Sequence, residues 1–229
     1  RNIRRVGLGN RDRRPSFADQ LSQAPRFLHN RRRTPVLPAS SLPRSRSTPP
    51  RQDEDMTNAT YAVHPTPIGE ALLVTTEAGL AALSVLDGPA YAEVARLSML
   101  LHAVPIEDEG PSAAAAAELD EYFAGERREF TVPLDWGLTA GFTRRALEAI
   151  VDVPYGQTAS YAEVAIAAGA PRAHRAVGTA CARTPWSIVL PAHRVIRSDG
   201  SIGEYGGRPE HKRFLLDLEE SVAGSTGRA

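Results

Sequence analysis

Residues 188–196 place a short polar turn between two apolar segments, with the sequence Ile-Val-Leu-Pro-Ala-His-Arg-Val-Ile. Pro191 fixes its own φ at about −65°, so the chain makes a rigid turn at this point. Polar groups on a turn between two buried segments are a common way of mounting a functional site on a rigid scaffold. The stretch therefore predicts a functional site at Ala192, His193 and Arg194. Its chemistry depends on residue 192, which is an alanine.

The length and composition are typical of a globular protein of one or two domains. The chain has 229 residues, and no apolar run reaches the length of about 18 residues that a transmembrane helix needs. Its single cysteine, Cys181, excludes an internal disulfide framework and fits a reducing compartment. The six histidines are scattered rather than spaced as zinc ligands, which argues against a zinc site. The sequence implies no metal and no organic cofactor.

The formal net charge is zero, but the charges are distributed unevenly along the chain. Residues 1–55 hold thirteen arginines and five acidic residues. Residues 56–139 hold three basic and thirteen acidic residues, and residues 140–229 hold eleven basic and nine acidic residues. Residues 158–197 contain five arginines and one acid, Glu163. A local basic face of this kind favours contact with nucleic-acid phosphates, although an ordinary solvated surface explains the same arginines equally well.

Residues 1–55 are rich in Arg, Pro and Ser and lack apolar periodicity, which predicts a disordered leader. The composition changes at Met56. The simplest interpretation is that Met56 is the true start and that the upstream residues are translated leader sequence or an over-long gene model. The alternative is a transit-like segment or a nonspecific DNA-binding tail, because the segment has many arginines and few acids.

Residues 56–139 predict a small α/β domain with an acidic surface. Two strand-like segments separated by a turn at 77–79 are typical of a hairpin, and five alanines followed by an aromatic pair predict a strong helix. No catalytic constellation is found in this part of the chain. Strands are expected at 61–64, 70–75, 80–86 and 130–134, and helices at 90–101 and 113–123.

Residues 140–220 predict a helical domain, which makes the fold class of the whole chain α+β. Ser160 followed three residues later by Glu163 forms a capping box that begins a helix through residue 168. Gly169 ends this helix, and Pro171 suits the first turn of a second helix through about residue 183. Two short helices joined by a glycine-containing turn have the outline of a winged-helix-like helix-turn-helix. Further helices are expected at 142–151 and 211–220, followed by a flexible tail at 221–229.

Six short motifs between residues 154 and 219 occur in the order and at the spacings of one known family. They are Pro154-Tyr155-Gly156, Ser160-Tyr161, Arg175-Ala176-Val177-Gly178, Pro191-Ala192-His193-Arg194-Val195, Tyr205-Gly206-Gly207, and Lys212 with Leu215-Leu216 and Glu219. Through these motifs the chain resembles the O6-alkylguanine-DNA alkyltransferase family. Residues 66–69, 122–125 and the helix from Phe142 are similar to the family's first domain, so the resemblance covers about residues 61–219.

The resemblance implies that the protein binds double-stranded DNA containing O6-alkylguanine and rotates the damaged base into a pocket. Arg175 matches the arginine that replaces the base in the stack, a role that suits a planar cation able to stack and hydrogen-bond at once. Tyr161 matches the tyrosine that crowds the phosphate, and Tyr205 matches the tyrosine of the loop that covers the base. The DNA-contacting residues are expected to be Tyr161, Arg172, Arg175, Arg183 and Arg194. The lesion pocket is expected to contain Tyr161, Pro191, Ala192, Val195 and Tyr205.

The resemblance fails at the residue that carries the family's chemistry. Family enzymes attack the alkyl carbon with the cysteine of Pro-Cys-His-Arg, while a histidine takes the thiol proton through a water and a glutamate orients the histidine. His193 and Glu219 match these two partners, but Ala192 stands at the acceptor position and has no proton to lose. Cys181 is expected to be a buried helix cysteine rather than a substitute acceptor. Thr184 is a second departure, since the family usually has an asparagine there.

Three functions remain open from the sequence. The first is a non-catalytic sensor that binds O6-alkylguanine and marks it for a nucleotide-excision-repair protein, although such sensors usually lack the first domain. The second is an active O6-methylguanine-DNA methyltransferase inactivated by a cysteine-to-alanine change at 192. The third is a helix-turn-helix regulator without lesion specificity, against which the retained Tyr161, Arg175 and Tyr205 argue. In each case we expect a monomer that contacts no membrane and that, in a bacterium, is cytoplasmic and associated with the nucleoid.

Overall fold

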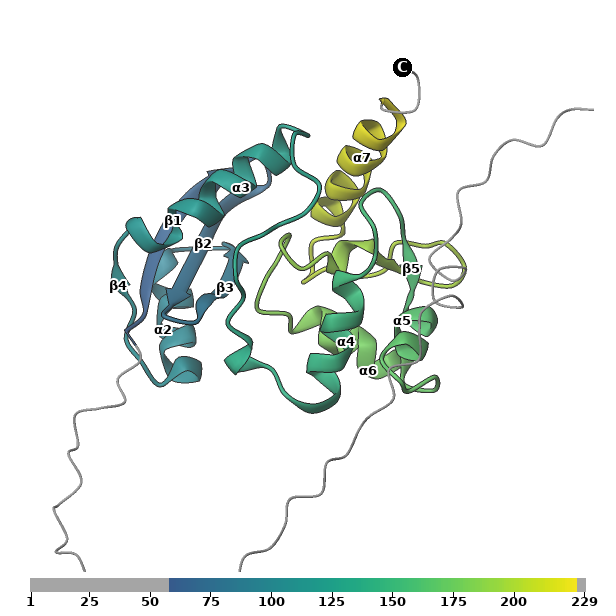
Figure 1. Cartoon of the computed structure of the whole chain (residues 1–229), viewed down its shortest axis with the longest axis horizontal. Helices are drawn as coiled ribbons and strands as arrows, with labels where there is room; N and C mark the ends of the chain where they lie inside the picture. The colour runs from purple at the N-terminus through teal and green to yellow at the C-terminus, as the bar shows by residue number, and fades with distance from the viewer. Residues whose placement is uncertain (1–57, 226–229) are drawn as a thin grey trace, which may run out of the picture. The chain divides into compact units, whose positions relative to one another are not determined.

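The computed structural model describes residues 58–225, which form two compact units (Figure 1). The first unit contains residues 58–140 together with Pro185–Val189. The second contains Gly141–Thr184 together with residues 190–225.

A four-stranded sheet with the strand order β3-β2-β1-β4 forms the centre of the first unit. β1 (Thr60–Thr66), β2 (Gly69–Thr76) and β3 (Gly79–Val85) form an antiparallel meander, and β4 (Ile106–Glu107) pairs in parallel with β1. Gly79 has a φ of +129°, and a Cβ at this position would lie 2.3 Å from the carbonyl oxygen of Pro133. Only glycine therefore fits the start of β3.

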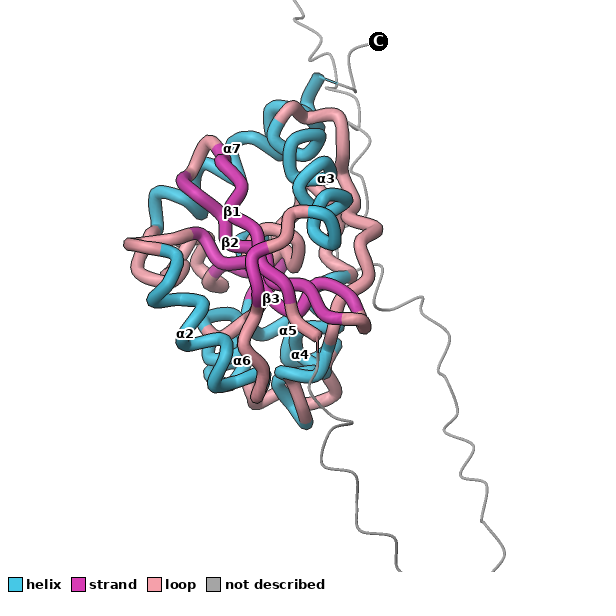
Figure 2. Tube along the Cα trace, turned by 90° about the vertical axis from the view of Figure 1, so that its left-hand side faces the viewer, coloured by secondary structure: helices cyan, strands magenta, loops and turns pink. Residues whose placement is uncertain are grey.

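Two helices, α2 (Ala90–Leu101) and α3 (Ala113–Phe123), lie on opposite sides of this sheet (Figure 2). Leu72 and Val74 of β2 pack with Leu97 of α2 in one apolar cluster. Successive side chains of a strand point to opposite faces, yet all four residues at 71–74 are fully buried because both faces are covered. Two short 3₁₀ helices complete the connections of this unit, η1 (Gly110–Ser112) and η2 (Trp136–Leu138).

A segment from much later in the chain, Pro185–Val189, completes the first unit, and we call it the strap. The backbone N–H of Leu83 in β3 donates to the carbonyl oxygen of Pro185 at 2.8 Å, and the N–H of Ser187 donates to the oxygen of Leu83 at 2.8 Å. The strap therefore pairs with β3 in the manner of a short additional strand. It covers an edge whose N–H and C=O groups would otherwise be open to pairing with another chain.

Trp186 anchors the strap in the core of the first unit. Its side chain is fully buried, and its indole N–H donates to the carbonyl oxygen of Leu80 at 2.7 Å. The ring also meets Trp136 edge-on, with the ring centroids 4.7 Å apart. A buried indole whose polar N–H is paired combines a large apolar contact with a fixed orientation.

The second unit is mainly helical, and its helices share one core. Leu147, Val164 and Val177, one from each of the helices α4, α5 and α6, are fully buried. A short parallel pair, β5 with β6, places the residues after Arg194 beside the start of α5. The elements are α4 (Gly141–Val151), β5 (Ala159–Ser160), α5 (Tyr161–Ala167), α6 (His174–Ala182), the 3₁₀ helix η3 (Ala192–Arg194), β6 (Val195–Ile196) and α7 (Pro209–Ser225).

The α+β fold class and the capping box are confirmed. The hydroxyl of Ser160 accepts from the N–H of Glu163 at 3.2 Å, and the Glu163 carboxylate accepts from the N–H of Ser160 at 2.7 Å. The leader predicted at 1–55 lies outside the described residues. No helix of residues 58–225 combines the length and apolar character that a bilayer span requires.

Three predicted boundaries were wrong. Residues 130–134 form no strand, because Pro133 lacks the N–H that a ladder needs, and they contact β3 through a single bridge at Leu134. The second helix of the pair begins at His174 rather than near Pro171. The last helix continues to Ser225 rather than ending at 220, and close packing of Ala223 against Gly156 holds its last turns.

Candidate functional site

The turn predicted from the sequence is buried inside the second unit. Pro191, with φ −80° and ψ 54°, precedes η3, and the side chains of Ala192, His193 and Arg194 are all buried. Ala192 is only 2 % exposed. A methyl group at this position offers neither a nucleophile nor a proton donor, so the chemistry of the turn belongs to its neighbours.

Glu219 of α7 connects the two polar residues of the turn. Its Oε1 lies 2.8 Å from Nε2 of His193, and its two oxygens accept from Arg194 at 2.9 and 3.0 Å. The backbone N–H of Gly156 donates to the same carboxylate at 2.9 Å, and Nη1 of Arg194 donates to the carbonyl oxygen of Val153 at 2.6 Å. The carboxylate thus meets donors from two segments of the unit, η3 and the loop at Gly156, which fixes its orientation.

The protonation states of this network follow from burial and pairing. Burial opposes the charge of Glu219, but hydrogen bonds and charges from His193 and Arg194 outweigh it and lower the pKa of Glu219 to about 2. Burial lowers the pKa of His193, against the opposing effect of Glu219. We therefore take the imidazole as neutral, with Nε2–H donating to Glu219 and the lone pair on Nδ1. This is the tautomer in which Nδ1 can accept a proton from a neighbouring group.

A pocket of about 250 Å³ lies beside the turn in the second unit. Its residues come from α5, α6 and the segment after β6, and they are Tyr161, Gly178, Cys181, Ala182, Arg197, Glu204, Tyr205 and Gly206. Of the residues expected in the lesion pocket, Tyr161 and Tyr205 line it, whereas Pro191, Ala192 and Val195 belong to the neighbouring turn and do not. The ring of Tyr205 meets the His193 ring edge-on at 6.4 Å, so the pocket and the turn are in direct contact. A pocket whose lining includes two tyrosines and several small residues is suited to a flat aromatic ligand.

A buried lysine connects the pocket to the turn from a second side. Lys212 is fully buried, and its ammonium donates to the carbonyl oxygen of Val195 at 2.5 Å. The ammonium also lies 6.0 Å from the ring centre of Tyr161. Burial lowers the pKa of Lys212 to about 8 and raises the pKa of the Cys181 thiol to about 12. The thiol therefore stays protonated at neutral pH and is a poor nucleophile.

The arginines expected to contact DNA do not all lie together. Arg172 and Arg175 near the start of α6 and Arg183 at its end are exposed, and none of them forms an ion pair with another described residue. Arg194 lies elsewhere, buried with its guanidinium on Glu219 and Val153. Its donors are used inside the protein, so the structure places it in the network of the turn and not on the surface of α6.

Several residues around the pocket are not among the site residues predicted from the sequence. Cys181, Arg197, Glu204 and Gly206 line the pocket, and Lys212 supports it. The sequence does hold a signal for Lys212. Residues 212, 215 and 219 lie on one face of a helix, and Leu215 on that face is an apolar core residue, so Lys212 is expected to face the interior as well. For Arg197 and Glu204 the local sequence holds no such signal.

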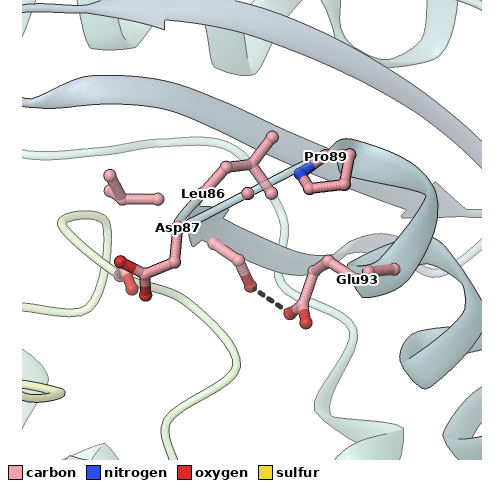
Figure 3. A pocket seen from close by; sticks show the side chains of 9 residues that line it. Leu86, Asp87, Pro89 and Glu93 are labelled. Carbon is pink, nitrogen blue, oxygen red and sulfur yellow. Dashed lines mark hydrogen bonds between the residues drawn. The ribbon is translucent and has the colours of Figure 1, made fainter.

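A larger cavity, of about 380 Å³, lies in the first unit between the end of β3, the start of α2 and the strap (Figure 3). Its walls carry the carboxylates of Asp87 and Glu93, and the Ser84 hydroxyl donates to Glu93 at 2.8 Å. None of the described residues that line it carries a positive charge. Its charge has the wrong sign for a phosphate, and it shares no residue with the His193 network, so we do not assign it to nucleic acid.

Comparison with known proteins gives two family models that together span most of the described chain. The 6-O-methylguanine DNA methyltransferase ribonuclease-like domain matches residues 59–136, and the DNA binding domain of the same enzyme matches residues 141–221. A methylated-DNA–protein-cysteine methyltransferase of Methanosarcina barkeri is 38% identical over 161 residues, which cover 70% of this chain and 97% of the relative. Its counterpart in Mycobacterium tuberculosis is 47% identical over 116 residues, which cover 51% of this chain and 70% of the relative.

Solved structures of similar fold include the O6-methylguanine methyltransferase of M. tuberculosis, with a TM-score of 0.61 and 37% identity. The alignment covers 72% of this chain and 94% of that one. The same mycobacterial protein in complex with DNA aligns with a TM-score of 0.61 and 37% identity, over 71% of this chain and 94% of that one.

Proposed function

Since the chain belongs to the O6-methylguanine-DNA methyltransferase family of DNA-repair proteins, we propose that it binds and flips O6-alkylguanine in duplex DNA without accepting the alkyl group. In this proposal the exposed arginines of α6 contact the DNA, and Arg175 fills the space left in the base stack. The flipped base enters the pocket between Tyr161 and Tyr205. The protein then acts as a lesion sensor whose bound complex is passed to a nucleotide-excision-repair protein.

The observation that carries the proposal is Ala192 at the position that matches the family's acceptor, next to the assembled His193–Glu219 pair. In transfer to a cysteine, a sulfur–carbon bond forms while the bond between O6 and the alkyl carbon breaks. The methyl side chain of Ala192 has no lone pair with which to form the new bond. Binding needs none of this chemistry, because it depends on the arginines of α6 and the walls of the pocket.

The composition of the pocket supports a flat aromatic ligand. Stacking of a base on an aromatic side chain contributes about 1–3 kcal/mol per base and tolerates any base. Gly178 and Gly206 carry no side chain into the pocket, which leaves backbone groups accessible to the polar edge of a base. Selectivity for a damaged base is then helped by the lower cost of unstacking a weakened pair.

A second candidate function is favoured by the assembled His193–Glu219 pair. Burying a carboxylate with its partners costs desolvation energy, and a protein that only binds DNA has no chemical use for a proton acceptor beside residue 192. On this alternative the active protein is an O6-methylguanine-DNA methyltransferase with a cysteine at 192. The change of that cysteine to alanine removes transfer of the alkyl group and leaves DNA binding in place. A helix-turn-helix regulator, the third function considered, needs neither this pair nor the pocket.

The experiment that tests the proposal measures binding of the full chain to two duplexes that differ in one O6-methylguanine, at about 0.15 M salt. We expect a clear preference for the damaged duplex and no methyl on the protein after incubation. Affinity for DNA falls steeply with salt, so both duplexes must be measured at one salt concentration. Equal affinity for the two duplexes would contradict the proposal and leave a basic DNA-binding surface only.

A further inference from the structure

Arg197, the residue after β6, lies at the mouth of the pocket in the second unit. Its side chain lines the pocket and is also exposed to solvent. A side chain with both properties stands at the boundary between the cavity and the surrounding water. Among the described residues of the lining, Arg197 alone carries a positive charge and Glu204 alone a negative one. A ligand with one anionic group therefore meets a single cation in this lining.

Most of the hydrogen-bond donors of the Arg197 side chain are unused within the described part of the chain. Nη1 donates to the Ser201 hydroxyl at 3.5 Å, and the guanidinium forms no other hydrogen bond with residues 58–225. The Ser201 hydroxyl in turn donates to the carboxylate of Asp199 at 2.7 Å. None of the ion pairs between described residues includes Arg197 or Glu204. A guanidinium has five N–H groups, so most of them remain for a ligand.

Gly203 shows how close Arg197 lies to the aromatic wall formed by Tyr161. A Cβ at Gly203 would lie 3.3 Å from the Tyr161 hydroxyl oxygen and 3.8 Å from both Cγ and Nε of Arg197. The hydroxyl group and the arginine side chain therefore border the same point. Burial raises the pKa of Tyr161, and the charge of Arg197 opposes that rise. The cation thus stands beside the hydroxyl end of the ring.

A flipped nucleotide brings two different chemical groups to such a pocket. Its base is flat and aromatic and enters the cavity, whereas its phosphate stays outside because the DNA strand is continuous. The phosphate is an anion, and a guanidinium binds it with two parallel N–H···O hydrogen bonds. When the base lies in the pocket, the phosphate is therefore left at the mouth, where Arg197 stands. Glu204 repels the phosphate, since both groups are negative.

We propose that Arg197 binds the backbone phosphate of the flipped nucleotide at the mouth of the pocket. The inference rests on the proposed function, since it takes the ligand of the pocket to be a flipped base. Arg194, which the sequence placed among the DNA contacts, cannot make this contact, because its donors are used on Glu219 and Val153. Arg197 holds only DNA in which the base has left the stack, so it contributes to selectivity as well as to affinity.

Arg197→Gln and a neutral linkage in the DNA test this contact together. A methylphosphonate replaces, in turn, each of the two phosphates that flank the O6-methylguanine. We expect Arg197→Gln to weaken binding to the damaged duplex about tenfold and binding to the undamaged duplex much less. At one of the two linkages, the methylphosphonate should cost the wild-type protein about tenfold and the variant almost nothing, because one contact is lost only once. Arg213→Gln, which removes an exposed charge from α7, should remain sensitive to that linkage.

The outcomes distinguish the inference from the function on which it rests. A wild-type protein that binds the damaged and undamaged duplexes equally would overturn both. A wild-type protein that prefers the lesion, together with independent losses from Arg197→Gln and from the methylphosphonate at both linkages, would overturn the role of Arg197 alone. Equal weakening on damaged and undamaged duplex in Arg197→Gln would also overturn it, since an ordinary phosphate contact behaves in this way.

Discussion

The guanidinium of Arg194 and the carboxylate of Glu219 form a bidentate ion pair in the interior of the second unit. Nε lies 2.9 Å from Oε2 and Nη2 lies 3.0 Å from Oε1, and the Glu219 side chain is 1 % exposed. The planar guanidinium satisfies both carboxylate oxygens, which Lys could not do. His193 consequently meets a carboxylate whose position and charge are already fixed.

The first prediction concerns the pH dependence of folding. The pKa of Glu219 is lowered from its usual 4.5 to about 2, so the folded state favours the charged form. The stabilisation is fully present above about pH 4.5 and is lost as the pH falls to about 2. We expect this group to contribute about 3 kcal/mol to the loss of unfolding free energy over that window. Urea denaturation at a series of pH values measures it.

Glu219→Gln provides the control for this titration, because it keeps the shape of the side chain and removes the ionisable group. Its unfolding free energy should be lower at pH 7, where Arg194 is left without its charged partner, and should depend less on pH between 2 and 4.5. If the variant and the wild type lost stability in parallel over this window, other carboxylates would be responsible.

The second prediction restores the missing nucleophile. Ala192→Cys should take up one methyl group from O6-methylguanine DNA, because His193 and Glu219 are in place to accept and stabilise the thiol proton. Mass spectrometry of the variant after incubation with the damaged duplex detects the product. Ala192→Cys combined with His193→Gln should react far more slowly. A folded, DNA-binding Ala192→Cys that stayed unmodified would show that the proton-accepting pair is not competent.

The third prediction separates Arg175 from an ordinary phosphate contact. Arg175→Ala should weaken binding to the damaged duplex roughly tenfold and binding to undamaged duplex much less, because only the flipped state needs the inserted side chain. Arg213→Ala, which removes another exposed arginine from α7, is the matched control for net charge. Equal losses on both duplexes in Arg175→Ala would reduce this residue to a phosphate contact.

The fourth prediction fills the pocket. Cys181 lies on its wall, and Cys181→Trp should occupy much of the 250 Å³ and abolish the preference for O6-methylguanine. Binding to undamaged duplex should persist, since the arginines of α6 are unchanged. Cys181→Ser, which keeps the size of the side chain, is the control, and circular dichroism checks that both variants fold. A tryptophan variant that still preferred the lesion would place the base elsewhere.

Local features of this protein could be predicted from the sequence, because their causes lie within a few residues. The capping box joins Ser160 to Glu163, and it is present as expected. The turn at Pro191 is likewise encoded by its own residue. The pairing of His193 with Glu219 could be predicted only through a resemblance to a known family.

The features that could not be predicted depend on residues far apart in the sequence. Arg194 looks like a surface arginine until Glu219, 25 residues later, is known to lie beside it. The strap pairs with a strand more than 100 residues earlier, through Trp186, which stands 106 residues from Leu80. No periodicity within the strap itself indicates that its partner is β3. The positive φ of Ile188, +69°, could not be predicted from the sequence either, since isoleucine is among the residues that least often adopt a positive φ.

The strap has a consequence for the order in which the protein is made. A chain leaving the ribosome exposes β3 long before residues 185–189 are synthesised, so the first unit begins with an open sheet edge and no Trp186 in its core. Unpaired edges of this kind make nascent chains prone to aggregation and attractive to chaperones. The unit whose sheet is synthesised earlier is therefore completed only after Gly141–Thr184 of the other unit has been translated.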